Sequence, residues 1–96
     1  MAQLNVSPGW RNQTGGQTSF VIDDGITLEQ VLIDFAHRFP DNAYRILGPD
    51  GPYRYLSVFV AEDGQTESER IGKDRWSTVR TTSMTVVDVL PPLAGG

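Results

Sequence analysis

Cysteine is absent from the 96-residue sequence, and histidine occurs only once, as His37. Without cysteine the chain has no disulfide, no thiolate metal site and no cysteine nucleophile. A single histidine leaves little basis for a serine–histidine–acid triad, and we expect His37 to be a solvated or helix-capping side chain. We therefore expect no catalytic residue in this chain and no enzyme activity of its own.

Long apolar runs and an excess of positive charge are also missing. No segment approaches the roughly 20 apolar residues that span a membrane. Residues 1–5 lack the basic and apolar regions of a signal peptide. The net charge of −4 argues against a nucleic-acid partner and suits a protein partner with a basic docking surface. We expect a cytoplasmic protein with neither a membrane nor a nucleic acid as its partner.

Acidic residues gather in two places, and neither predicts a metal site. Four carboxylates in the polar segment 62–75 could bind a cation, but we expect this segment to be a solvated surface loop, because charge runs usually are; the four are Glu62, Asp63, Glu67 and Glu69. The run Asp23-Asp24-Gly25 is typical of a turn. The pair Gly15-Gly16 lacks the helix and the lysine of a phosphate-binding loop. We expect no bound metal and no bound cofactor.

The length, together with an apolar share of 39%, predicts a single domain over residues 1–96. Its clearest element is a helix over residues 27–39, in which Thr27 and Gln30 form a capping box and Pro40 ends the pattern. The apolar stripe of this helix consists of Leu28, Val31, Leu32, Phe35 and Phe39. A short helical turn is expected over 41–47, with Tyr44 and Leu47 packed inward, and a loop over 48–52.

Apolar and β-branched segments predict strands over residues 2–8, 17–23, 56–61 and 84–90. In segment 56–61, Phe59 faces away from Leu56, Val58 and Val60. Residues 76–81 are a short strand or the lead-in to the last one, with Trp76 packed in the core or at an edge. This order predicts an α+β, β-grasp fold: a mixed sheet crossed by one main helix, with the first and last strands adjacent at its centre.

The segment after the last predicted strand carries the strongest functional signal. It reads Leu90-Pro91-Pro92-Leu93-Ala94-Gly95-Gly96. Glycine lacks Cβ, so Gly95 and Gly96 can pass through a narrow channel, while the two prolines hold the preceding segment extended. We expect a flexible tail over residues 91–96 that presents the carboxylate of Gly96 to another enzyme.

This ending, the capped helix at 27–39 and the strand at 56–61 together resemble the MoaD/ThiS family of ubiquitin-like sulfur carriers. The segment Thr14-Gly15-Gly16-Gln17 is similar to the bacterial carriers that feed cysteine biosynthesis. The resemblance implies that an E1-like adenylyltransferase uses ATP to activate Gly96, and that sulfur transfer then yields a thiocarboxylate. A second partner, a cysteine synthase-like or other biosynthetic enzyme, would accept the sulfur.

The resemblance implies two kinds of contact with these partners. Tail residues 91–96 thread into the partner, with Leu93 in an apolar pocket, and Phe59 is the candidate docking residue on the sheet beside them. Which metabolite receives the sulfur stays open between cysteine, molybdopterin, thiamine and a secondary metabolite. Two alternatives also stay open: a ubiquitin-like modifier conjugated through Gly96 to lysines, and a permanent small subunit of a molybdopterin-synthase-like complex.

Overall fold

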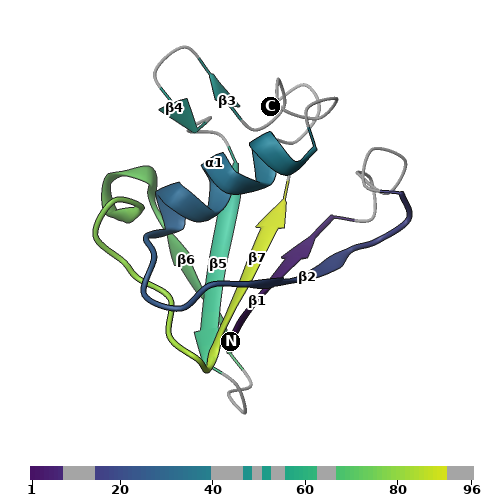
Figure 1. The fold of residues 1–96 in the computed structure, drawn as a ribbon. Helices are drawn as coiled ribbons and strands as arrows, with labels where there is room; N and C mark the ends of the chain where they lie inside the picture. Colours follow the sequence, from purple (N-terminus) through teal and green to yellow (C-terminus); the bar gives the residue numbers. More distant parts are fainter. Residues whose placement is uncertain (8–14, 40–46, 49–50, 53–55, 63–66, 91–96) are drawn as a thin grey trace.

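The computed structural model describes residues 1–7, 15–39, 47–48, 51–52, 56–62 and 67–90 (Figure 1). A five-stranded mixed sheet, in the order β2-β1-β7-β5-β6, carries one helix across one face (Figure 1). The elements are β1 Ala2–Val6, β2 Ser19–Ile22, α1 Leu28–Arg38, β3 Leu47–Gly48, β4 Gly51–Pro52, β5 Ser57–Glu62, β6 Glu69–Ile71 and β7 Thr85–Leu90. The predicted α+β, β-grasp arrangement is confirmed.

The first and last strands lie side by side in the middle of the sheet, as predicted. β1 and β7 run parallel, with Leu4 opposite Val87, and β5 pairs antiparallel with the other side of β7. Val87 and Val89 are each only 1% exposed because they point toward α1. The strand that precedes residues 91–96 is therefore held by a ladder on each side and by the core beneath it.

Helix α1 begins where the sequence predicts. The Thr27 side chain accepts a hydrogen bond from the Gln30 amide at 3.1 Å, which satisfies one of the free N–H groups of the first turn. The predicted return contact of the capping box is wrong, because the Gln30 side chain donates to Asp34 at 2.7 Å instead. The Phe39 N–H bonds to Phe35 and closes the last turn. The buried helix residues are Leu28, Val31, Leu32, Phe35 and Ala36.

Segment 62–75, predicted as a surface loop, contains the fifth strand of the sheet. Strand β6 pairs with β5, with Ile71 opposite Val58, and a short 3-10 helix, Lys73–Arg75, follows. The prediction failed because β6 has three residues and only Ile71 is buried, which is too short for an alternating pattern. Trp76, predicted in the core or at an edge, is 1% exposed, and its indole N–H donates to the Ile71 carbonyl at 2.8 Å.

The region after α1 is also more strand-like than predicted. Of the helical turn expected over 41–47, residues up to 46, including Tyr44, lie outside the described residues. Leu47 belongs to a two-residue strand and pairs with Pro52, while Gly48 pairs with Gly51, so residues 48, 51 and 52 of the expected loop belong to a small antiparallel ladder; residues 49–50 lie outside the described residues. Such a ladder is too short to leave a periodic signal. Leu47 does pack against the core, as predicted.

Candidate functional site

The tail that we expect to enter a partner lies outside the described residues. We call it the thread, and it comprises Pro91, Pro92, Leu93, Ala94, Gly95 and Gly96. The structure describes the strand to which this thread is attached. Leu90 ends β7, opposite Ser57 at the start of β5, and the preceding Val89 lies opposite Val6 at the end of β1. Leu90 is 43% exposed. The thread therefore starts from the central strand of the sheet.

The face of the sheet that points away from α1 adjoins this exit point. Because side chains alternate along a strand, Val86, Asp88 and Leu90 of β7 point away from buried Val87 and Val89. We call this surface the outer sheet face, and it includes Asn5, Ser57, Phe59, Ala61, Arg70, Val86, Asp88 and Leu90. Phe59, the predicted docking residue, lies on this face as expected and is half-buried.

One row of side chains crosses the outer sheet face at Phe59. Arg70 lies opposite Phe59 on β6, and Asp88 lies opposite it on β7. Within the described ranges, neither the Arg70 nor the Asp88 side chain forms a hydrogen bond or an ion pair. The Phe59 ring thus lies between two charged side chains, and Ala61 and Val86 are paired next to it. The surface has an apolar centre with polar side chains on both sides. Protein interfaces are commonly built this way.

Two of the four carboxylates considered in segment 62–75 have structural partners. Glu62 ends β5 and accepts hydrogen bonds from Thr82 at 3.2 Å and Thr85 at 3.3 Å, so its prediction as a loop residue is wrong. Glu69 pairs with Arg75 at 3.0 Å. Asp63 lies outside the described residues. Among the described residues there is no cluster of three or more His, Cys, Asp or Glu side chains.

The predicted turn at Asp23-Asp24-Gly25 is stabilised by contacts from distant parts of the chain. The Asp24 carboxylate accepts from the Ala2 amide at 2.9 Å, and the Thr81 hydroxyl donates to the Asp23 carbonyl at 2.8 Å. Gly25 has φ of 75°, which glycine adopts without strain. These contacts make the segment a structural junction between β2, α1 and the approach to β7.

His37 is exposed in the last turn of α1, where a basic side chain faces the negative end of the helix. None of the helices in the described ranges is long and apolar enough to cross a membrane.

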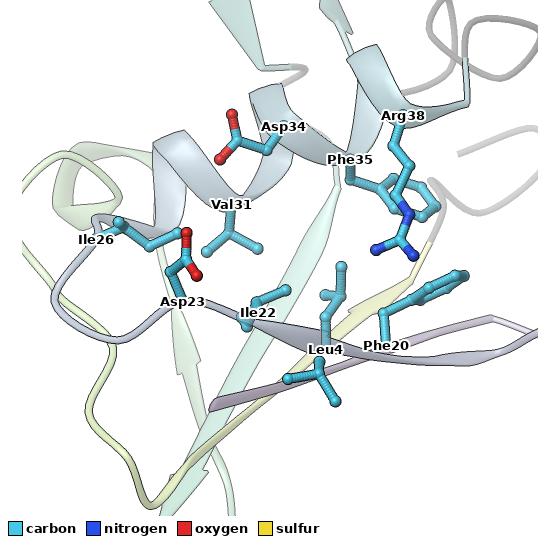
Figure 2. A pocket seen from close by; sticks show the side chains of 10 residues that line it. Leu4, Phe20, Ile22, Asp23, Ile26, Val31, Asp34, Phe35 and Arg38 are labelled. Atoms are coloured by element: carbon cyan, nitrogen blue, oxygen red, sulfur yellow. The ribbon is translucent and has the colours of Figure 1, made fainter. Parts of the chain in front are cut away.

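Sequence reasoning missed a cavity of about 170 Å³ between α1 and β2 (Figure 2). Seven of its ten lining residues are apolar, and three charged side chains, Asp23, Asp34 and Arg38, stand at its rim (Figure 2). The lining comes from β1, β2, the following turn and α1, which are separated in the sequence. No local pattern could have revealed it; only the amphipathic stripe of α1 indicated one wall.

The sequence matches no protein-family model and no curated protein. Several solved structures are nevertheless similar. CysO from Mycobacterium tuberculosis is 19% identical, with 97% of this chain and 100% of that chain covered, at a TM-score of 0.68. The Haloferax volcanii small archaeal modifier protein 1 is 18% identical, with 96% and 97% covered, at a TM-score of 0.66.

A chain in the Amycolatopsis orientalis BexX/CysO complex is 21% identical, with 100% of both chains covered, at a TM-score of 0.67. Identities this low establish a shared fold and not a shared activity. The chain therefore has the β-grasp, ubiquitin-like fold that its resemblance to the MoaD/ThiS sulfur carriers predicts.

Proposed function

We propose that this protein is a ubiquitin-like sulfur carrier and acts as a co-substrate of other enzymes. The observation that carries the proposal is the placement of the segment Pro-Pro-Leu-Ala-Gly-Gly directly after the central strand β7 of a β-grasp sheet. A strand held on both sides gives a partner a rigid surface to grip. The glycines beyond it give that partner a backbone without side chains to draw into its active site.

The proposed chemistry takes place at the carboxylate of Gly96. A carboxylate oxygen attacks the α-phosphorus of ATP, pyrophosphate leaves, and an acyl-adenylate forms on the partner enzyme. Sulfide (HS⁻) then attacks the acyl carbon, AMP leaves, a proton is released, and a thiocarboxylate results. This chain supplies the acyl group, while the E1-like partner binds the nucleotide. A side chain at position 96 would crowd the attacked carbon, which accounts for glycine there.

The outer sheet face is the proposed docking surface for the activating enzyme. It adjoins the strand from which the thread leaves, and Phe59 offers an aromatic anchor between the charges of Arg70 and Asp88. Aromatic side chains commonly dominate interface energies. The net charge of −4 favours a partner surface of opposite sign. Leu93 would supply a second apolar contact within the thread.

Intact mass of the protein purified from its own host tests the carrier function. We expect a species that ends at Gly96 and is heavier by the difference between sulfur and oxygen, and fragmentation should place this gain on Gly96. A variant without Gly96 serves as the control and should lack the heavier species. If the wild-type mass stays unchanged after incubation with ATP, sulfide and the activating enzyme, the proposal is wrong.

A protein modifier is the second candidate, and the fold likeness to a small archaeal modifier protein favours it. The same activated carboxylate would then form an isopeptide bond with a lysine amine. Proteolysis of host proteins would leave Gly-Gly on modified lysines, and this remnant would disappear in a strain that lacks the gene. An unmodified chain in a stable complex with a larger protein would instead support a permanent synthase subunit.

A further inference from the structure

The two edges of the sheet differ in how well they are protected. At the β6 edge, the Trp76 indole N–H donates a hydrogen bond to the Ile71 carbonyl. The ion pair of Glu69 with Arg75 places charged side chains on the same edge. At the other edge, β2 carries the sequence Ser-Phe-Val-Ile, and Val21 is 64% exposed. Charged residues and covering groups normally protect edge strands from pairing with other chains. Strand β2 has no charged side chain of its own, and among the described residues the Gln17 side chain covers only its Ser19 carbonyl.

The hydrogen-bond pattern shows which backbone groups of β2 remain open. The Val6 amide donates to the Thr18 carbonyl at 2.9 Å. Antiparallel ladders alternate hydrogen-bonded and non-hydrogen-bonded pairs, so Val21, opposite Gln3, belongs to a non-bonded pair. Its N–H and C=O therefore point away from β1. Ser19, two residues before Val21, follows the same alternation. Its carbonyl accepts a hydrogen bond from the Gln17 side chain and not from β1.

The cavity between α1 and β2 runs beside this open edge. Its floor and walls are Leu4, Phe20, Ile22, Ile26, Val31 and Phe35 (Figure 2). An apolar cavity of about 150 Å³ can hold a benzene molecule. The 170 Å³ found here thus has room for one branched aliphatic side chain. We call the cavity and the adjacent edge of β2 the β2–α1 groove.

The charges along the β2–α1 groove are ordered. Asp23 and Asp34 stand at the end near Ile26 and Val31, and Arg38 stands over Phe20 at the other end (Figure 2). The Arg38 guanidinium lies 5.1 Å from the Phe20 ring centre, which holds the positive charge in place. Within the described residues none of the three forms an ion pair. Asp34 does accept a hydrogen bond from the Gln30 side chain, but no opposite charge in the described ranges neutralises Asp23, Asp34 or Arg38.

We propose that the β2–α1 groove binds an extended segment of a partner protein, which adds to the sheet as a strand beside β2. The open N–H and C=O of Val21 would bond to the backbone of the segment. One apolar side chain would enter the cavity. Because alternate side chains share a face, the residues two before and two after it would also face the groove. A basic side chain would lie toward Asp23 and Asp34, and an acidic one toward Arg38.

A second copy of this chain would fit the β2–α1 groove poorly. If two β2 strands paired edge to edge, the side chains on the groove side would be Phe20 and Ile22 of each copy. Phe20 is only 3% exposed, because it is packed in its own core. Ile22 is partly buried against the same core and lines the cavity of its own chain, so a copy of β2 would have to release these side chains before it could fill the cavity of its partner. A free extended segment has no such restriction, and strand addition to a sheet edge is a known mode of peptide recognition.

The probe is the peptide acetyl-Lys-Thr-Ile-Thr-Glu-amide, titrated into the isotope-labelled full chain and followed by amide chemical shifts. We expect the largest changes at Val21 and along the α1 side of the groove. Replacing the central Ile of the peptide by Ala should weaken binding. If the shifts instead gather on the outer sheet face, or if none occur, the proposal is overturned.

The variant Val21→Pro tests the strand addition directly. Proline lacks the N–H that faces the open edge, and it is tolerated where that N–H makes no ladder bond. We expect at least about tenfold weaker peptide binding, whereas the control Val21→Thr, which keeps the amide, should bind as the wild type does. Equal binding by a folded Val21→Pro variant would overturn the proposal. The proposal would also be overturned if the wild-type chain self-associates and Val21→Pro abolishes this self-association. The occupant of the groove would then be a second copy of the chain.

Charge reversal gives a second test that does not depend on the proline variant. The wild type should prefer the Lys/Glu peptide over acetyl-Lys-Thr-Ile-Thr-Lys-amide by about threefold, the effect of an exposed ion pair. Arg38→Glu should invert this preference, and Arg70→Glu on the opposite edge should leave it unchanged. An unchanged preference in Arg38→Glu contradicts the proposal. No tail residue, nucleotide or sulfur enters these measurements, so their outcome is independent of the proposed carrier function.

Discussion

Glycine serves this chain in two physically different ways. At Gly25 the requirement lies in the backbone, because φ is 75° while a Cβ added there would meet no atom within 4 Å. At Gly96 the proposed requirement is steric and arises in the active site of the partner. A methyl group at position 25 would therefore affect folding, whereas one at position 96 would affect only the reaction.

Gly96→Ala should slow adenylation sharply and leave thermal stability unchanged. The added methyl group would crowd the carboxylate at the moment of attack, while β7, which ends at Leu90, keeps its ladders. Pyrophosphate release in the presence of the activating enzyme measures the rate. Ala94→Gly is the matched control, because it removes a methyl group from the same thread. A normal rate for Gly96→Ala would show that the channel tolerates a side chain.

Thr27→Ala should lower the free energy of unfolding by about 1 kcal/mol. The change removes the hydroxyl that accepts from the Gln30 amide at 3.1 Å and leaves that first-turn N–H without its cap. In a chain of this size the melting temperature should fall by about 4–8 °C. Ser77→Ala, at an exposed position, is the control and should stay within about 0.5 kcal/mol of the wild type. Equal melting of the two variants would mean that water replaces the cap at no cost.

At the scale of elements, the parts that could be predicted have a repeating pattern. The stripe from Leu28 to Phe35 and the cap at Thr27 identified α1 within one residue at its start. Strands β3, β4 and β6 have two or three residues each, too few for a period to register. β6 is held by its ladder with β5 and by a contact between the Trp76 indole and the Ile71 carbonyl. That contact depends on the tertiary fold, so it could not be inferred from local sequence.

Trp76→Ala should cost about 3–5 kcal/mol, the usual effect of deleting a large aromatic side chain from a core. Trp76 is 1% exposed and belongs to the main core cluster. Trp76→Phe keeps a ring but leaves the Ile71 carbonyl without its indole donor, for a loss of about 1–3 kcal/mol. Denaturant unfolding gives both values. Amide exchange should show β6 losing protection before β7 in the Phe variant; uniform loss would show that β6 is not held by this contact.

At the scale of the whole molecule, the two candidate binding surfaces differ in how visible they were in the sequence. Phe59 was placed on the face away from the core by simple alternation within segment 56–61, and the structure agrees. The β2–α1 groove could not be seen, because it arises only when α1 packs across β2 and leaves Val21 at an open edge. The outward-facing residues of a single strand can be predicted from the local sequence. A groove between two elements can be predicted only when the packing of those elements is known.

Because the outer sheet face and the β2–α1 groove lie on different parts of the sheet, their effects should separate. Phe59→Ala should weaken binding to the activating enzyme by about tenfold, as expected for a central aromatic anchor, and leave binding of the Lys/Glu peptide unchanged. Val21→Pro should weaken binding of the Lys/Glu peptide and leave binding to the activating enzyme unchanged. Adenylation rates at limiting carrier concentration and peptide titrations measure the two effects. His37→Gln, an exposed change on the last turn of α1, should alter neither. If either variant impairs both activities while melting normally, the two surfaces are parts of one site.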